Sequence, residues 1–269
     1  MEDKMAKNRI TLGGPFSRRL NLPKSQKIKR SFFKLNKKAF TLAEVLITLT
    51  IIGVVSALTI PTLTQNIEKQ KTVTALKKAH AELAQVVERA KVEHGDVKDW
   101  DFNLSGFEFF DTYLNNYLIV QTVTRAEFNK QNNIKYKEIS GKEETGLSIF
   151  RFGEGRFLTL PSGAHIMQTE TNYYNNYYGR RGINIDINGL APPNTLGKDV
   201  FFFVILQENG RVVPHYFDDQ ELFKELPDRK KLKDGPSSFR YQCNKQGRGL
   251  WCGALIYADG WKISKDYPW

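Results

Sequence analysis

An uncharged apolar segment dominates the first quarter of the chain. No charged residue occurs from Val45 to Ile67. As a helix, these 23 residues would extend about 35 Å, enough to cross the ~30 Å hydrocarbon core of a bilayer. Beyond Pro61 the apolar residues recur every three or four positions, at Val73, Leu76, His80, Leu83, Val87 and Ala90. This period predicts an amphipathic helix that ends at Gly95, with His80 as a packing residue.

Beyond Gly106 the pattern predicts short strands separated by turns. A short helix is expected from Phe107 to Asn116. The expected strands are Leu118–Thr124, Leu147–Phe152, Arg156–Leu160, Val200–Gln207, Arg211–Phe217, Ala254–Ala258 and Trp261–Ile263. Glu208-Asn209-Gly210 and Asp259-Gly260 suit hairpin connections, so the sheet is expected to be antiparallel. The fold class is therefore predicted to be α+β, with a long N-terminal helix packed by its distal half on an antiparallel sheet.

The net charge of +11 lies almost entirely in the N-terminal segment. Residues 1–39 contain twelve Lys and Arg and only two acidic residues, whereas residues 40–269 contain 28 basic and 27 acidic residues. The bulk charge of the body therefore does not indicate a nucleic-acid partner. Because cations flank the apolar segment on its N-terminal side, residues 1–39 are expected in the cytoplasm and the chain after Thr64 across the membrane.

Two simple interpretations of the apolar segment are an uncleaved signal anchor and a secretory signal peptide. Val55-Ser56-Ala57 would serve as a cleavage site and release a chain that begins at Leu58. Neither interpretation explains Glu44 at the start of the segment. A carboxylate costs a few kcal/mol when it lies deep in lipid, so a functional role for Glu44 is expected.

A third interpretation takes the residues around Glu44 together. Lys37-Lys38-Ala39, Phe40-Thr41-Leu42-Ala43-Glu44 and the apolar segment resemble the N-terminal signature of type IV prepilins and of the pseudopilins of type II secretion. The resemblance implies that a prepilin peptidase cleaves between Ala39 and Phe40 and methylates the new N-terminus. Here Ala39 replaces the usual glycine, and the leader is long. Glu44, one turn after Phe40, is expected to neutralise the new amine of a neighbouring subunit or of its own chain.

The resemblance also implies an organisation and a location. Residues 1–39 would be a basic leader, residues 40–94 a hydrophobic and amphipathic helix with the membrane span, and residues 95–269 an exported globular domain. The expected partners are prepilin peptidase, other pilin or pseudopilin subunits, the assembly machinery and the inner (cytoplasmic) membrane. The subunit would cross that membrane once, with its N-terminus in the cytoplasm, and after processing would join a pilus or pseudopilus. Secretion, adhesion, motility and DNA uptake all stay open.

The chain contains two cysteines, Cys243 and Cys252, in the segment expected outside the cytoplasm. A disulfide is the natural expectation there. Two cysteines are too few for a tetrahedral zinc site without histidine, and the nearest histidine, His215, lies 28 residues before Cys243. Many pilins carry a disulfide near the C-terminus, so the resemblance points the same way.

Asp186, Asn188 and Asp199 concentrate oxygen ligands in a segment rich in turn-forming residues. Calcium takes six to eight oxygen ligands, which these side chains and loop carbonyls could supply. Some pseudopilins bind calcium in a loop of the globular domain. The favoured alternative is a hydrogen-bonded turn that joins two strands, and no other cofactor is expected.

A tyrosine-rich loop is the remaining candidate for binding. It comprises Tyr173, Tyr174, Tyr177, Tyr178, Arg180 and Arg181. Such side chains can stack on bases or sugars, so an alternative function is a membrane-anchored or secreted binding module for glycan or DNA. The near-neutral body argues against nucleic acid. No nucleophile elbow or phosphate loop occurs, and no enzymatic activity is expected.

Overall fold

The computed structural model describes most of the chain after the leader. The described ranges are 40–122, 134–143, 156–167, 179–189, 191–216, 226–237 and 239–269. The chain divides into two units, Met1–Ile52 and Gly53–Trp269. In its described part the first unit is the start of helix α1 (Leu42–His94), and the second unit holds the rest of the chain. The predicted strand Leu147–Phe152 lies outside the described residues.

In the first unit, the apolar side chains of α1 are exposed. They include Leu46, Ile47, Leu49, Ile51 and Ile52. Among the described residues, α1 is the one helix that is long and apolar enough to cross a membrane. Surface of this kind needs lipid or another apolar partner to cover it.

In the second unit, the distal half of α1 buries one side. The buried residues are Leu76, Ala79, Leu83, Val86, Val87 and Ala90, spaced as the amphipathic pattern predicts. Helix α1 ends at His94, and Gly95 follows with a φ of +77°. A left-handed residue in this position closes many helices and favours glycine, so the predicted helix end is confirmed.

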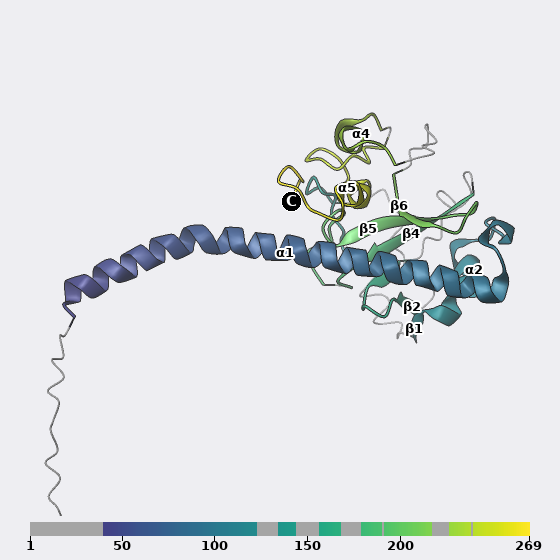
Figure 1. Cartoon of the computed structure of the whole chain (residues 1–269), viewed down its shortest axis with the longest axis horizontal. Helices are drawn as coiled ribbons and strands as arrows, with labels where there is room; N and C mark the ends of the chain where they lie inside the picture. Colours follow the sequence, from purple (N-terminus) through teal and green to yellow (C-terminus); the bar gives the residue numbers. More distant parts are fainter. Residues whose placement is uncertain are drawn as a thin grey trace, which may run out of the picture. The chain divides into compact units, whose positions relative to one another are not determined.

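Six antiparallel strands form one sheet in the order β1-β2-β3-β4-β5-β6 (Figure 1). Their bounds are Ile119–Thr122, Arg156–Thr159, His165–Met167, Arg180–Asp186, Val200–Leu206 and Val212–Pro214. Strands β4 and β5 pair over their full length, from Arg180 opposite Leu206 to Asp186 opposite Val200. The predicted turn at Glu208–Gly210 joins β5 to β6, with Gly210 at a φ of +70°.

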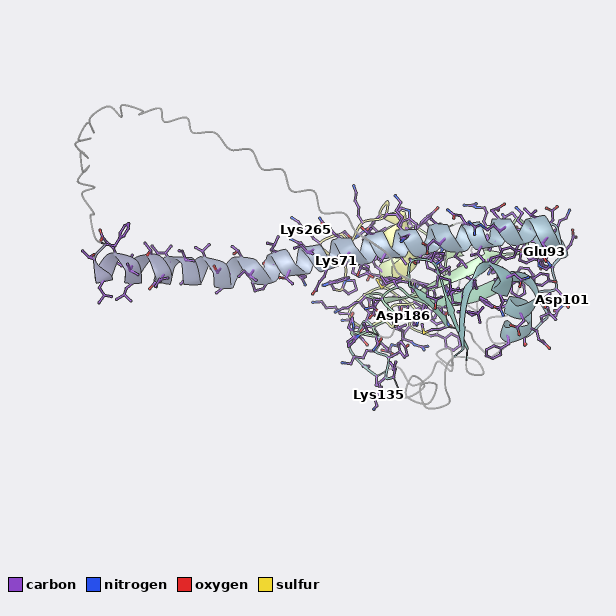
Figure 2. All side chains as sticks on the ribbon, turned by 90° about the horizontal axis from the view of Figure 1, so that it is seen from below. Lys71, Glu93, Asp101, Lys135, Asp186 and Lys265 are labelled. Carbon is purple, nitrogen blue, oxygen red and sulfur yellow. A yellow bond between two sulfur atoms is a disulfide. The ribbon has the colours of Figure 1, made fainter. Side chains whose placement is uncertain are left out.

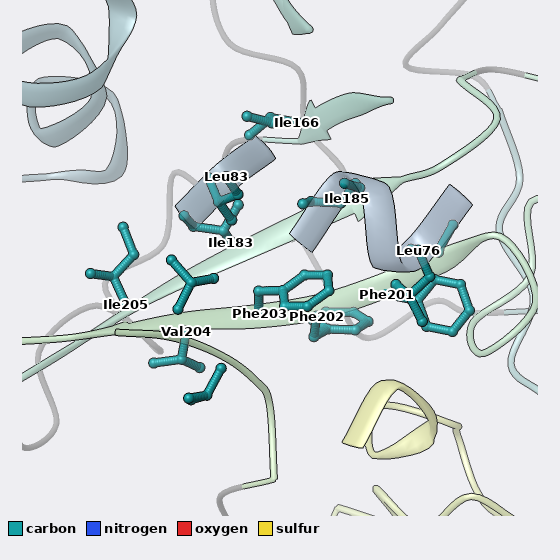
Figure 3. Packing of buried hydrophobic residues seen from close by; sticks show 14 of the residues in the cluster. Leu76, Leu83, Ile166, Ile183, Ile185, Phe201, Phe202, Phe203, Val204 and Ile205 are labelled. Carbon is teal, nitrogen blue, oxygen red and sulfur yellow. The ribbon is translucent and has the colours of Figure 1, made fainter. Parts of the chain in front are cut away.

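The distal half of α1 lies along one face of this sheet (Figures 1 and 2). Figure 3 shows Leu76 beside Phe201 of β5 and Leu83 beside Ile183 of β4. His80 is half-buried on the same side of α1, with its ring centroid 5.5 Å from that of Phe203. Its Nε2 lies 2.9 Å from the carbonyl oxygen of Val212, so His80 packs as expected. The fold is α+β and pilin-like, as the sequence predicts.

Short helices complete the second unit. They are η1 (Val97–Asp99), α2 (Gly106–Phe109), η2 (Phe110–Leu114), η3 (Asn115–Tyr117), α4 (Arg229–Asp234) and α5 (Cys252–Ala258). A capping box starts α2: the Ser105 hydroxyl accepts from the Glu108 N–H, and the Glu108 carboxylate accepts from the Ser105 N–H. The helix predicted from Phe107 to Asn116 corresponds to α2, η2 and η3.

Two secondary-structure predictions differ from the structure. The strand predicted at Ala254–Ala258 is wrong, because these residues form the end of α5, buried from Cys252 to Ile256. A short apolar run fits a buried helix as well as a strand, and here contacts with β5 and β6 decide for the helix. Trp261–Ile263 forms no strand either. Strands β3 and β4 were not predicted.

Candidate functional site

The start of α1 is built around Thr41 and Glu44. The Glu44 Oε2 accepts hydrogen bonds from the Thr41 backbone N–H at 2.8 Å and from the Thr41 hydroxyl at 2.9 Å. The Thr41 Oγ1 in turn accepts from the Glu44 backbone N–H at 3.2 Å. This reciprocal pattern is a capping box, which satisfies N–H groups that the first turn of a helix leaves without partners.

This cap assigns Glu44 a contact that the sequence analysis did not predict. The signal was present, because Thr41-Leu42-Ala43-Glu44 fits the capping-box pattern directly before an apolar run. The Glu44 side chain is nevertheless exposed, so its carboxylate stays accessible to a cation from outside this helix. Phe40, the expected first residue of the mature chain, directly precedes Thr41 and is exposed, whereas Ala39 lies outside the described residues.

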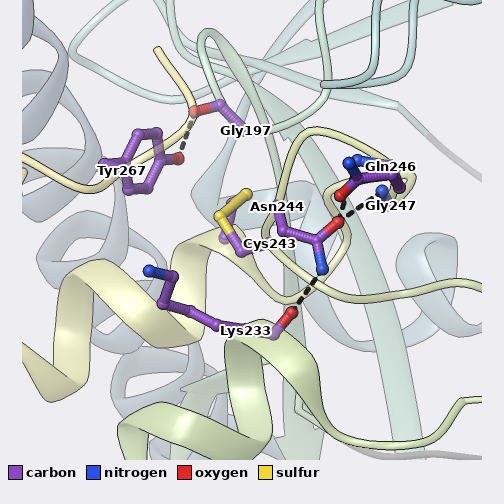
Figure 4. The surroundings of a disulfide bond; sticks show 8 residues. Gly197, Lys233, Cys243, Asn244, Gln246, Gly247 and Tyr267 are labelled. Carbon is purple, nitrogen blue, oxygen red and sulfur yellow. Dashed lines mark hydrogen bonds between the residues drawn. A yellow bond between two sulfur atoms is a disulfide. The ribbon is translucent and has the colours of Figure 1, made fainter.

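The structure contains the expected disulfide between Cys243 and Cys252 (Figure 4). Both cysteines are fully buried, and their Cα atoms are 4.8 Å apart. The bond ties the first residue of α5 to the loop after α4, where the Asn244 side chain donates to the Lys233 carbonyl at 2.6 Å. Gly197 packs against the disulfide so closely that a Cβ there would lie 2.7 Å from the Cys252 Sγ. The disulfide is therefore part of the body's core.

Replacing both cysteines with alanine is expected to lower the free energy of unfolding by about 2.5 to 3 kcal/mol. This is the chain-entropy value for a loop whose ends are nine residues apart in sequence. Denaturant unfolding of the purified full chain in detergent, followed by tryptophan fluorescence, measures the loss. A free-thiol count of two in unreduced, denatured wild-type protein would contradict the bond itself.

Asp186 is the last residue of β4 (Figure 2). Asp199 lies close to it, directly before β5. The Asp199 carboxylate accepts from the N–H groups of Thr195 at 2.6 Å and Asn194 at 2.7 Å, and from the Asn188 amide at 3.4 Å. Asp186 Oδ1 accepts from the Asn188 N–H at 3.2 Å. These bonds match the turn that the sequence analysis favoured. Among the described residues, no group of three or more His, Cys, Asp or Glu is placed to hold a metal ion.

The Asp186 carboxyl group carries the largest electrostatic perturbation in this turn. It is fully buried, and its Oδ2 has no hydrogen-bond partner among the described residues. Burial, and secondly the nearby charge of Asp199, raise the pKa of Asp186 from 3.8 to about 8. The folded protein therefore holds this group protonated at a pH at which the unfolded chain releases the proton. Stability is then expected to fall as the pH rises from about 4 to about 8.

Replacing Asp186 with asparagine is expected to flatten this pH dependence. The amide keeps the acceptor for Asn188 but does not ionise, so the variant should gain on the order of a few kcal/mol over wild type at pH 8. Unfolding of the full chain at several pH values measures the effect, and a constant difference in unfolding free energy between the two proteins would contradict it.

Calcium binding at Asp186, Asn188 and Asp199 stays a prediction. If calcium binds there, added calcium should stabilise the wild type and not Asp186→Asn.

The tyrosines of the candidate binding loop, Tyr173, Tyr174, Tyr177 and Tyr178, lie outside the described residues. Arg180 and Arg181 belong to β4 instead of a loop. Arg181 is fully buried, and its Nη2 donates to the carbonyl oxygens of Phe102 at 2.9 Å and Leu104 at 2.8 Å. Its guanidinium lies 4.3 Å from the centre of the Phe109 ring. Arg181 therefore lies inside the body, where it joins β4 to the segment before α2.

The chain matches two family models. The prokaryotic N-terminal methylation motif covers residues 34–60, which include Ala39, Phe40 and Glu44, and confirms the type IV prepilin-like N-terminus. A family of unknown function, DUF6613, covers residues 62–269. The chain belongs to the DUF6613 family. The DUF6613 region thus comprises the amphipathic half of α1 and the disulfide-bonded body. Neither a curated protein nor a solved structure matches the chain.

Proposed function

We propose that this DUF6613 protein is a prepilin-like structural subunit that assembles into a type IV pilus or a type II secretion pseudopilus. The observation that supports this proposal most strongly is the match of residues 34–60 to the N-terminal methylation motif. In addition, the first half of α1 exposes its apolar side chains. Prepilin peptidase removes residues 1–39, and the apolar half of α1 then packs against the same region of other subunits. Burial of that surface drives assembly.

The positions of the cations and cysteines on either side of the apolar segment support an orientation of the unassembled subunit in the membrane. Twelve cations precede the apolar segment, and the cysteines form a disulfide after it. Cations stay on the cytoplasmic side, and disulfides persist in oxidising compartments. We therefore place the leader in the cytoplasm, α1 in the inner membrane and the body outside the cytoplasm, from where the assembly machinery moves it into a fibre.

A structural role accounts for more of the chain than the alternatives do. The prepilin-like motif favours a subunit over an enzyme. The binding module for glycan or DNA was inferred from a loop that included Arg181, which is buried within the body. Polymerisation is thus the function that the described residues support best.

Processing tests this proposal. Ala39→Trp is expected to block cleavage when the chain is expressed with a prepilin peptidase, because the peptidase needs a small residue before the cut. Ala39→Gly is the matched control and should be cleaved at least as well as wild type. The mobility of the membrane-bound chain on a denaturing gel reports the loss of the leader. Equal cleavage of Ala39→Trp and wild type would contradict processing at this site.

A further inference from the structure

A cationic cleft lies beside α1 just after its apolar half. It has a volume of about 520 Å³, within the range of small-molecule sites. Its charged lining residues are Lys69, Lys233, Lys245, Lys265, Asp234 and Asp266. Asp266 already pairs with Lys233 at 2.6 Å and with Arg229, so the cleft keeps an excess of positive charge.

Trp269 lines this cleft and a neighbouring one. The second cleft is also lined by Pro61, Thr62 and Thr64, and its charged lining residues are Lys198 and Glu68. The Lys69 and Lys198 ammonium groups lie 5.9 Å and 5.7 Å from the centre of the Trp269 ring. We call Lys69, Lys198, Lys265 and Trp269 the Lys–Trp cluster. Within the described ranges, none of its three lysines pairs with a carboxylate, so their charges are available to an external anion.

Packing within the second unit fixes the cluster against α1. The Thr72 hydroxyl of α1 donates to the Lys198 carbonyl at 3.2 Å. The buried Tyr267 hydroxyl donates to the carbonyl of Gly197, the residue before Lys198. The cluster therefore keeps a set position along the helix.

That position coincides with the end of the exposed apolar surface. Ile60 and Leu63 are 58% and 60% exposed, and Lys69 follows within two helical turns. If the apolar half of α1 spans a bilayer, these turns lie at the level of the headgroups. Tryptophan concentrates at that level, and lysine extends its ammonium group toward it.

We propose that the Lys–Trp cluster binds the headgroups of anionic phospholipids in the membrane that holds the unassembled subunit. Lysines bind phosphate oxygens through charge-assisted hydrogen bonds, and an anionic membrane surface attracts each nearby lysine. The proposal rests on the membrane anchoring of α1 and adds a lipid preference to it. The contact holds the body against the bilayer and is released when the subunit leaves the membrane.

Tryptophan quenching in vesicles tests the proposal. The mature full-length chain is reconstituted in phosphatidylcholine alone or with about one third phosphatidylglycerol, each brominated near the top of the acyl chains. The difference between wild type and Trp269→Phe isolates the Trp269 signal, because Trp100, Trp251 and Trp261 remain in both. Trp269 quenching is expected to be strong with the anionic lipid and weak without it.

Charge variants then identify the lysines. An anionic surface contributes about fivefold per nearby lysine, so Lys69→Gln/Lys198→Gln/Lys265→Gln should lose most of the lipid-dependent quenching. Lys98→Gln/Lys135→Gln/Lys142→Gln removes the same charge from residues that line neither cleft, and should behave as wild type.

Three outcomes would overturn the proposal. The first is Trp269 quenching that is equally strong in vesicles with and without phosphatidylglycerol. The second is equal quenching in the triple variant of the cluster lysines and in the triple variant of the control lysines. The third is an unquenched Trp269 in an inserted chain that crosslinks to a second copy through the cluster lysines, which would make a neighbouring subunit the partner. Failure to float with vesicles of either composition would contradict the membrane anchoring itself, which separates that failure from loss of the lipid contact.

Discussion

Replacing Glu44 with alanine is expected to abolish incorporation of the mature chain into fibres. In the proposed fibre the new amine of Phe40 would lie among apolar helices, and Glu44 is the acidic residue nearest to it along the mature chain. Removing one partner of a buried ion pair costs about 3 to 5 kcal/mol, which is two or more decades in the equilibrium for adding a subunit. Cleavage should continue, because Ala39 and the cationic flank are unchanged.

The capping box makes a sharper version of this experiment available. Glu44→Gln keeps an oxygen that can accept from the Thr41 N–H but removes the charge, whereas Thr41→Ala keeps the charge and removes the hydroxyl. Loss of a cap costs about 1 kcal/mol. If Glu44 neutralises an amine, Glu44→Gln fails to assemble and Thr41→Ala assembles nearly normally. The reverse order would show that capping is the role of Glu44. Normal incorporation of Glu44→Ala in sheared fibres would show that the carboxylate is not needed for assembly.

Leu83→Ala is expected to destabilise the body by about 2 to 5 kcal/mol, because it empties a fully buried position between α1 and the sheet. Val92 lies on the same helix but is 89% exposed, so Val92→Ala should stay within about 0.5 kcal/mol of wild type. Denaturant unfolding of the full chain in detergent measures both. Equal stability of the two variants would contradict the packing of α1 on the sheet.

The elements predicted correctly are those in which the apolar pattern repeats over many residues or in which a turn has characteristic residues. The distal half of α1 repeats its apolar positions over several turns, and Gly95 and Gly210 mark its end and the β5–β6 turn. Helix α5 was misassigned because five apolar residues carry too little periodicity. Strand β4 was missed because Arg181 is a charged residue in its interior, stabilised by Phe102 and Phe109 some seventy residues earlier in the sequence.

Some of the candidate sites could likewise be predicted from a local sequence pattern, and others depend on the folded structure. The processing and assembly residues form one contiguous motif, so Ala39, Phe40 and Glu44 could be identified from local pattern, and the capping box was equally visible there. The proximity of Asp186 and Asp199 was also predicted, but the protonation of Asp186 depends on burial that only the assembled sheet provides. The Lys–Trp cluster joins α1, the turn before β5 and the end of the described chain, and no local pattern connects them.

The intact mass of the chain recovered from membranes and sheared fibres tests the central claim most directly. Processing as a prepilin predicts a chain that begins at Phe40 and carries one added methyl group, with the disulfide intact. An unmethylated chain that begins at Leu58, or a chain that still begins at Met1 in cells containing an active prepilin peptidase, would contradict it.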